Sequence, residues 1–280
     1  MNILGIPFDG AVLGRKGAKG GPAAIRQAMA GFSNYNIELG MGLEDARIFD
    51  LGDLVVDEDV LEAHRQIENE VSQDLAENSL LAIIGGDNSI SFPSIRAFTR
   101  RFGEIGLIVL DSHFDLRGNI GGRPTSGSSY GLAVDEDGVD PKRVVEVGIH
   151  GFLNSKKYFE EARRLGIKVY TAGDVAELGP RAVAERAYQI ASKGAKAVYL
   201  SVDLDALDIG HVSGVSAPSA GGMSSQHLFE LVYEIAAHSL VKCADLVELA
   251  PSLDPSEKSQ RVAATALVYL IAGFVSRVRS

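Results

Sequence analysis

The chain has 280 residues, and its 37 acidic residues outnumber its 27 lysines and arginines to give a formal net charge of -10. This balance excludes nucleic acid as an expected partner, because a surface that binds a duplex needs clustered basic residues to displace counterions. Hydrophobic residues make up 46% of the chain and charged residues 23%, which is typical of a globular protein and not of a disordered one. The single cysteine, Cys243, reads as a buried strand residue, excludes an internal disulfide framework and favours a cytoplasmic location. Neither an export signal nor a membrane span is expected.

Short apolar runs and segments with helical spacing alternate along the chain. The expected strands cover residues 3–6, 46–49, 80–84, 105–110, 144–147, 167–170, 197–202 and 241–247. The expected helices cover residues 22–29, 59–77, 91–101, 155–165, 180–192, 225–237 and 260–274. The strands are too continuously apolar for a sheet wetted on one face, so helices must cover both faces. The pattern predicts one α/β domain over residues 1–280, a three-layer αβα sandwich with a mostly parallel sheet of about eight strands.

Three long irregular stretches, residues 10–21, 118–140 and 205–223, interrupt this alternation. Loops of this length in a compact domain are usually functional. In open parallel sheets, ligands bind beyond the carboxyl ends of the strands, so the residues that follow each strand are the candidates for a site.

Carboxylates gather after two of the expected strands. Asp111, His113 and Asp115 follow the strand at 105–110, and alternate residues of an extended chain point the same way. Asp203 and Asp205 repeat this spacing after the strand at 197–202. A single Asp-x-Asp pattern is also typical of a turn or a helix cap. Two such patterns after two buried strands favour a metal site.

The expected ligand set is rich in oxygen and includes an imidazole, which suits a hard divalent ion such as Mn2+ better than a structural zinc ion. Carboxylates shared by two close ions would lower the pKa of a bridging water. Without a metal, the crowded carboxylates would repel one another and take up protons.

Ordered motifs along nearly the whole chain resemble the ureohydrolase family of arginases, agmatinases and formimidoylglutamases. The motifs lie at residues 5–9, 21–26, 85–87, 111–115, 201–208 and 247–254. The resemblance implies two Mn2+ ions and a bridging hydroxide that attacks the planar carbon of a guanidino or formimino group. It also implies a homo-oligomer, a trimer or a hexamer, and a small-molecule substrate.

The resemblance assigns roles to the residues at the strand ends. For one ion it implies three carboxylate ligands, Asp111, Asp115 and Asp203, beside the position of Asn88. For the other ion it implies an imidazole and three carboxylates, His113, Asp111, Asp203 and Asp205. Asp205 would also orient the nucleophile and take up its proton, and Glu248 would pair with the cationic nitrogen of the substrate.

Three positions depart from the common pattern of the family. Asn88 replaces a histidine ligand, and because an amide oxygen is a weaker ligand for a transition ion, we expect the metal site beside it to be weak. Tyr130 stands where arginases have a histidine, which argues against an arginase. Gly131 replaces an arginine frequent in formimidoylglutamases, so a substrate carboxylate would need another cation, Arg123 or Arg15.

Substrate contacts are expected from the loops after the strands. The candidate residues are Ser126, Gly127, Tyr130, His150, Asn154 and Glu248. The segment at residues 147–158 resembles the formimidoylglutamase branch. His64, in a charged helical segment, is expected on the solvated surface.

The leading hypothesis is a formimidoylglutamase, which converts N-formimidoyl-L-glutamate and water to L-glutamate and formamide in histidine degradation. One alternative is an agmatinase or another guanidino hydrolase that releases urea. A second alternative is a metal-depleted, non-catalytic binding protein on the same scaffold.

Overall fold

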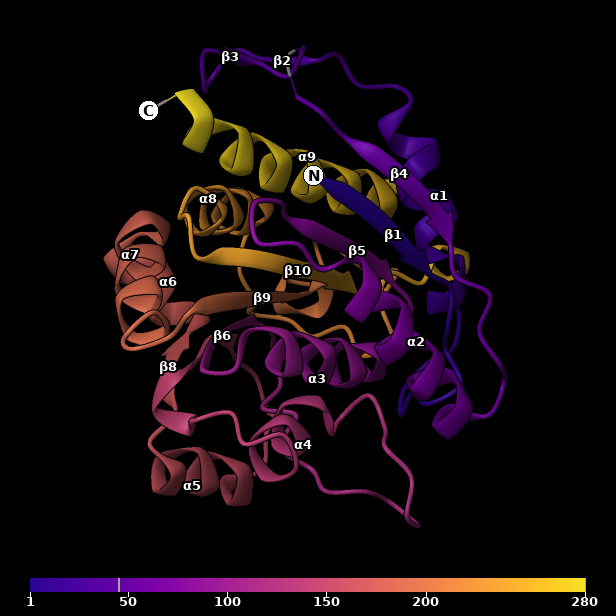
Figure 1. Cartoon of the computed structure of the whole chain (residues 1–280), viewed down its shortest axis with the longest axis vertical. Helices are drawn as coiled ribbons and strands as arrows, with labels where there is room; N and C mark the ends of the chain where they lie inside the picture. Colours follow the sequence, from indigo (N-terminus) through magenta and orange to yellow (C-terminus); the bar gives the residue numbers. More distant parts are fainter. Residues whose placement is uncertain (45, 280) are drawn as a thin grey trace.

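The computed structural model describes residues 1–44 and 46–279, with side chains described up to residue 277. An eight-stranded sheet crosses the molecule, with helices on both of its faces (Figure 1). Its strands lie in the order β4 (Phe49–Asp53), β1 (Asn2–Ile6), β5 (Leu81–Gly85), β10 (Val241–Val247), β9 (Ala197–Asp203), β6 (Ile105–Leu110), β7 (Val144–Ile149) and β8 (Lys168–Thr171). Neighbouring strands of this sheet pair in parallel. The predicted three-layer α/β sandwich is confirmed.

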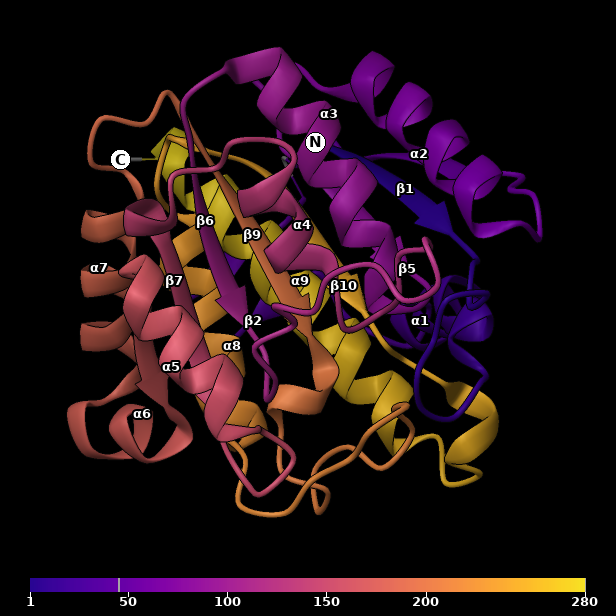
Figure 2. The same ribbon diagram turned by 90° about the horizontal axis from the view of Figure 1, so that it is seen from below.

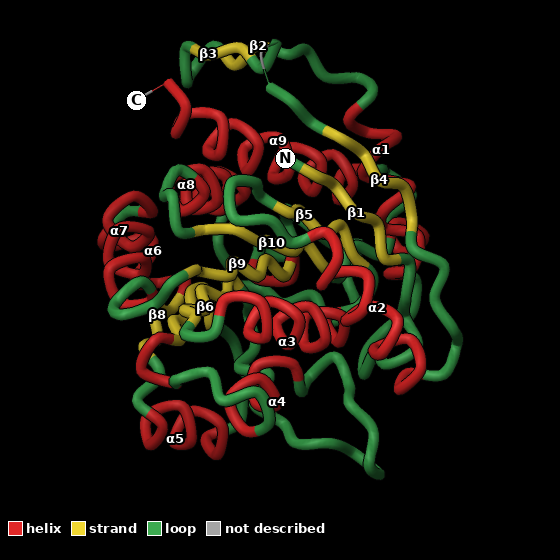
Figure 3. Tube along the Cα trace, in the orientation of Figure 1, coloured by secondary structure: helices red, strands yellow, loops and turns green. Residues whose placement is uncertain are grey.

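The helices form the two outer layers (Figure 3). One face carries α1 (Gly21–Met29), α6 (Ala172–Leu178), α7 (Pro180–Ala191), α8 (Ser225–Ala236) and α9 (Lys258–Arg279). The other face carries α2 (Val60–Asp74), α3 (Ser91–Phe102), α4 (Ser129–Asp135) and α5 (Lys156–Leu165). Each layer packs its apolar side chains on the sheet to form its own core cluster.

Strand β6 shows why the apolar runs predicted this architecture. All six of its residues are buried. Ile108 and Leu110 belong to the core cluster on one face of the sheet, and Leu107 and Val109 belong to the cluster on the other. A strand that is covered on both sides therefore reads as a continuous apolar run.

Edges and short helices are where the structure differs from the prediction. The strand expected at 46–49 begins at Phe49 and runs to Asp53 as the edge strand β4, most of whose side chains are exposed. This segment is a strand because its backbone pairs with β1, and the apolar pattern of its side chains does not predict it. Helices α4 and α6, of seven residues each, were not predicted, because they are too short to show a clear period. A small hairpin, β2 (Tyr35–Asn36) and β3 (Met41–Gly42), lies outside the main sheet.

Helix α9 is the longest helix of the described residues. By length and composition alone, the part from Lys258 to Arg277 could cross a membrane, but 67% of its most apolar window is buried inside the protein. It packs on α8 and α1 as part of the core. Cys243 is buried in β10, as predicted.

The strand order brings four strand ends together. Strands β5, β10, β9 and β6 are consecutive neighbours at the centre of the sheet, although they are far apart in the sequence. Because they are parallel, their carboxyl ends lie along the same edge, as the arrowheads of β6 and β9 show in Figure 2. Short 3-10 turns follow β5 (Asn88–Ile90) and β9 (Leu204–Ala206) at this edge. The segments that carry the predicted ligands therefore meet at one place.

Candidate active site

A cavity of 180 Å³ lies at the carboxyl ends of the four central strands. Eight of the predicted site residues line it: Asn88, His113, Asp115, Ser126, Gly127, Asp203, Asp205 and Glu248. Asp111 is fully buried, and one ligand atom each from Asp111, His113 and Asp205 lies within 4.8 Å of the others. The structure therefore brings the predicted metal ligands together.

The three long loops supply the rest of the wall. Leu13 and Gly14 come from the first loop, Ser126 and Gly127 from the second, and Ser216 from the third. The first two loops are joined directly, because the Leu13 backbone N–H donates a hydrogen bond of 3.0 Å to Ser126 Oγ. The predicted positions of Ser126 and Gly127 at the cavity agree with the structure.

Local turns orient the carboxylates. The His113 backbone N–H donates to Asp111 Oδ1 at 2.7 Å, and the Asp205 backbone N–H donates to Asp203 Oδ1 at 2.8 Å. The hydroxyl of Ser112 donates to Asp205 Oδ1 at 2.8 Å. The turn interpretation of Asp111 and Asp203 is therefore confirmed, and it leaves the second oxygen of each of these carboxyl groups outside the turn.

The site concentrates negative charge in a buried place. Burial raises the pKa of Asp111 and Asp203 well above the usual range, and the neighbouring carboxylates add to the rise. Burial also raises the pKa of Asp115 to about 6 and that of Glu248 to about 8. Burial by itself would lower the pKa of His113, but the carboxylates of Asp205 and Asp111 outweigh it and raise that pKa to about 12. The site needs positive charge, whether from protons or from bound cations.

The donor set fits a divalent metal ion. Asp111 Oδ2 and Glu248 Oε2 are buried and have no hydrogen-bond partner among the described residues. Buried polar atoms normally have partners, so these two oxygens are free to bind a cation. Asp115 and Glu248 also have left-handed backbone conformations, with φ of 44° and 70°. Such strain in residues other than glycine is typical of functional sites.

Asn88 lies between the carboxylates and the protein interior. Its backbone N–H donates to Glu248 Oε1 at 2.7 Å, and its Nδ2 donates to Asp115 Oδ2 at 2.6 Å. Its Oδ1 accepts from Ser91 Oγ at 2.9 Å and from Tyr130 OH at 3.2 Å. In this orientation the amide nitrogen faces the ligand carboxylates and the amide oxygen faces inward.

Three predicted substrate contacts lie off the cavity wall. Tyr130 is fully buried in α4, where its hydroxyl contacts Asn88 and Ser201. His150 and Asn154 line a separate, more open pocket of 550 Å³. The Asn154 amide donates to the Ser112 carbonyl at 2.7 Å, so it supports the chain that enters the site.

The sequence interpretation missed one cationic side chain of this cavity. Arg117 lines the cavity, and its guanidinium group lies 5.5 Å from the centre of the Tyr158 ring. The two arginines suggested from sequence are engaged elsewhere. Arg15 donates to the Ser213 and Val215 carbonyls, and Arg123 pairs with Asp59 at 2.9 Å. The sequence signal that could have identified Arg117 is its place two residues after Asp115, in the same segment that follows β6.

The prediction for His64 was wrong. This residue is buried in α2, and its ring Nε2 lies 3.2 Å from Ser89 Oγ. Phe8 and Phe92 make edge contacts with the ring, and burial lowers its pKa to about 4. Its charged neighbours in sequence, Glu62 and Arg65, pair with each other at the surface, so the segment around His64 looked solvated.

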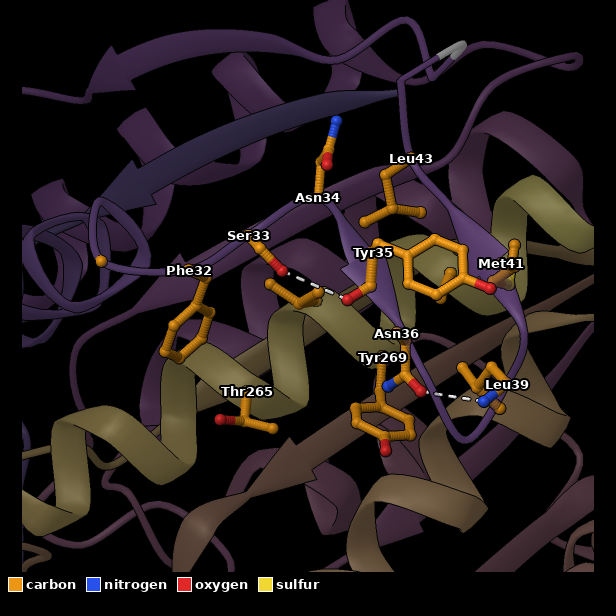
Figure 4. Close-up of a pocket in the computed structure, with 13 residues that line it drawn as sticks. Phe32, Ser33, Asn34, Tyr35, Asn36, Leu39, Met41, Leu43, Thr265 and Tyr269 are labelled. Carbon is orange, nitrogen blue, oxygen red and sulfur yellow. Dashed lines mark hydrogen bonds between the residues drawn. The ribbon is translucent and has the colours of Figure 1, made fainter.

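A larger pocket of 330 Å³ lies between the β2–β3 hairpin and α9 (Figure 4). Aromatic and aliphatic side chains such as Phe32, Tyr35, Leu39 and Met41 dominate its wall. The described residues that line it include no histidine, cysteine or carboxylate. Its size alone does not make it the catalytic site.

The chain is a three-layer α/β protein, and carboxylates and an imidazole lie at the carboxyl ends of its parallel strands. These features define a class of α/β proteins whose site suits divalent metal ions. The sequence profile of the arginase family matches residues 1–273, and the chain belongs to this family. The formimidoylglutamase of Halalkalibacterium halodurans is 33% identical over 98% of this chain and 86% of its own length. The guanidinopropionase of Pseudomonas aeruginosa is 32% identical over 97% of this chain and 85% of its own length. The sequence-based assignment to this family of hydrolases is confirmed.

The fold agrees with a solved structure. The formiminoglutamase of Trypanosoma cruzi, crystallised with Mn2+, has a TM-score of 0.92 and 31% sequence identity, over 99% of this chain and 93% of the other. Agmatinases are also among the relatives.

Proposed function

We propose that this chain is a formimidoylglutamase, which converts N-formimidoyl-L-glutamate and water to L-glutamate and formamide. The observation that carries the proposal is the presence of Arg117 and Glu248 in one cavity. The substrate has a cationic formimino group on its α-nitrogen, one carboxylate beside that nitrogen and a second carboxylate at the far end of its side chain. A site with a carboxylate and a guanidinium group matches both ends.

The residues of the cavity have distinct tasks in this reaction. Glu248 would hold the formimino cation, because an adjacent positive charge favours the ionised form of a carboxyl group. Arg117 would bind a substrate carboxylate through a charge-assisted hydrogen bond, and the ring of Tyr158 would keep the guanidinium group in place. Asp205 would orient the attacking water and accept its proton, while its contact with His113, 3.0 Å from Nδ1 to Oδ2, fixes the carboxylate.

The metal proposal covers two Mn2+ ions held by the predicted residues. Asp111, Asp115 and Asp203 would hold one ion beside Asn88, and His113, Asp111, Asp203 and Asp205 would hold the other. When bound, such ions would supply a nucleophile by lowering the pKa of a water molecule in the cavity. The support for manganese is the donor set with its orphaned oxygens and the Mn2+ in the T. cruzi relative.

We further propose that residues 1–280 act as one catalytic domain in the cytoplasm, within a homo-oligomer of three or six chains. The buried, lone Cys243 is compatible with a reducing compartment. The oligomer follows from the family resemblance alone.

A guanidino-acid hydrolase that releases urea is the second candidate, because the guanidinopropionase of P. aeruginosa is about as similar as the formimidoylglutamases. Its substrate also has a cationic and an acidic end. Agmatine fits less well, since its second positive group would face Arg117. The third candidate is a binding protein that has lost metal through Asn88.

A substrate panel with the purified chain and Mn2+ separates these candidates. Formamide released from N-formimidoyl-L-glutamate, at a kcat/KM far above any release of urea, supports the proposal. Urea from guanidinopropionate or guanidinobutyrate with no formamide would replace it by the second candidate. No product from any substrate, with less than one tightly bound ion per chain, would favour the third.

A further inference from the structure

A continuous buried network lies behind Asn88. The hydroxyl of Tyr130 lies 3.2 Å from Asn88 Oδ1 and 3.1 Å from Ser201 Oγ. The Ser201 hydroxyl in turn donates to Asp245 Oδ1 at 2.6 Å. These four side chains are at most 1% exposed. They connect the amide beside the metal ligands to a carboxylate on β10 that does not line the cavity.

Ser91, the first residue of α3, provides a second branch. Its hydroxyl donates to Asn88 Oδ1 at 2.9 Å. Burial raises the pKa of Asp245, and hydrogen bonds from Ser201, Tyr199 and Ser91 oppose that rise. Each hydroxyl that contacts the Asn88 amide therefore has a second group to which it can donate. For the Tyr130 hydroxyl this group is Ser201, and for the Ser91 hydroxyl it is Asp245.

The orientation of the Asn88 amide decides what it can do at the metal site. The NH2 group that now faces Asp115 is a donor and cannot ligate a cation, whereas the carbonyl oxygen can. A half-turn about the last side-chain bond exchanges the two atoms at nearly the same positions. After that half-turn the oxygen would face the Asp115 carboxylate and a cation bound there.

The network can accept the amide in the turned orientation. A hydroxyl both donates and accepts, so Tyr130 can accept a hydrogen bond from the turned NH2 group if its own proton goes to Ser201. Ser201 has free lone pairs, because its proton is already donated to Asp245. Ser91 can accept in the same way and direct its proton to Asp245. All the protons then point toward Asp245, and no buried donor lacks a partner.

We propose that Tyr130 is a positioning residue of the metal site, whose hydroxyl lets the Asn88 amide turn its oxygen toward a bound divalent cation by donating to Ser201. This inference rests on the metal part of the proposed function and is independent of the substrate. It gives Tyr130 a different role from the substrate contact expected from sequence. It also explains how a chain with Asn88 in place of a histidine can still offer a ligand atom at that position.

The test compares the Mn2+ affinity of two matched variants, Tyr130→Phe and Tyr199→Phe, by isothermal titration calorimetry of the whole chain. Both variants remove one hydroxyl from a fully buried tyrosine in the network, but Tyr199 bonds to Asp245, at 2.7 Å, and not to Asn88. We expect Tyr130→Phe to weaken the weaker Mn2+ site about tenfold, because a buried amide donor loses its partner. We expect Tyr199→Phe to change the affinity by less than about twofold, since the amide keeps its partners. An unchanged affinity in Tyr130→Phe, or equal losses in both variants, overturns the inference.

The same comparison in an Asn88→Asp variant distinguishes a positioning role of Tyr130 from a general effect on packing. In Asn88→Asp both terminal atoms are oxygens, so no half-turn is needed. Adding Tyr130→Phe in this background should then cause no loss of Mn2+ affinity, and a tenfold loss there would contradict the inference. Thermal unfolding of each variant shows whether it is folded. If the unaltered chain binds no Mn2+, the metal part of the proposed function fails; normal binding with no effect of Tyr130→Phe overturns the inference alone.

Discussion

The cavity at the strand ends and the pocket under the hairpin differ in what their polar atoms do. The hairpin pocket is the larger of the two, 330 Å³ against 180 Å³. Its polar groups are satisfied locally, since Ser33 Oγ donates to the Tyr35 carbonyl and Asn36 Oδ1 accepts from the Leu39 backbone N–H (Figure 4). The cavity at the strand ends contains orphaned carboxylate oxygens instead. Buried carboxylate oxygens without partners therefore identify the candidate catalytic site, and the volume of a pocket alone does not.

The two sites also differ in how the chain builds them. Residues 31–43 and one face of α9 form the hairpin pocket. The cavity takes its residues from the ends of four strands and from three loops. A parallel sheet fixes the positions of its strand ends, so it can hold carboxylates together against their mutual repulsion. The cost of that repulsion is the physical basis of the second prediction below.

The largest expected effect is the loss of a shared ligand. Asp203→Asn removes a negative charge that both proposed ions would share, and we expect kcat/KM to fall about 1,000-fold, a loss of several kcal/mol of charge stabilisation. Bound manganese, measured by elemental analysis, should fall with it. Asp208→Asn is the control, since Asp208 accepts hydrogen bonds from the Gly210 and Gly221 backbones outside the cavity. Full metal content and activity in Asp203→Asn would remove this residue from the site.

The second prediction concerns the stability of the metal-free chain. A carboxyl group whose pKa is higher in the folded state stabilises the fold at low pH and loses that contribution as the pH rises through the folded pKa. Asp115, with a pKa of about 6, and Glu248, with a pKa of about 8, both have this sign. Buried His64, with a pKa of about 4, has the opposite sign, but its contribution is complete above about pH 6.5. The unfolding free energy measured with a chelator should therefore fall between about pH 6.5 and pH 8, by about 2 kcal/mol, as Glu248 ionises.

Manganese and one substitution sharpen this prediction. Added Mn2+ should restore stability at the alkaline end, because a cation replaces the protons. Glu248→Gln should flatten the upper part of the pH dependence, since the amide does not titrate. A metal-free chain that becomes more stable as the pH rises over this range would contradict the proposed crowding of charge.

The third prediction tests the cationic wall of the cavity. Arg117→Gln should raise the KM for N-formimidoyl-L-glutamate about 10- to 100-fold, because a hydrogen bond between charged groups is lost, and kcat should change little. Arg123→Gln is the matched control, since Arg123 pairs with Asp59 away from the cavity. Steady-state kinetics of both variants decides the point. Equal KM values for Arg117→Gln and the unaltered enzyme would mean that a group other than Arg117 binds the substrate carboxylate.

The sequence was sufficient for the sheet and for the carboxylates that line the cavity because both signals are local. A buried strand appears as an apolar run, and Asp111, His113 and Asp115 directly follow one at alternate positions. The strand order of the structure, which the sequence did not predict, places these residues beside Asp203 and Asp205. Family resemblance supplied the roles that local pattern could not.

The missed features depend on contacts between distant segments. His64 looked solvated because its neighbours in sequence are charged, but Ser89 and two phenylalanine rings bury it. Tyr130 looked like a loop residue that touches substrate, but the short helix α4 turns it into the interior. Neither the position of a helix on a sheet nor the direction of one buried hydroxyl can be deduced from periodicity.

The smallest expected effect belongs to the hairpin pocket and completes the contrast between the two sites. Tyr35 lines that pocket and is 55% exposed. We expect Tyr35→Ser to leave kcat/KM and Mn2+ affinity within about twofold of the unaltered values, because exposed positions away from a site have small energetic effects. The same kinetic and calorimetric measurements apply. A change of more than about fivefold would mean that the two sites are coupled through α9 and the sheet, since distant residues without shared partners act independently.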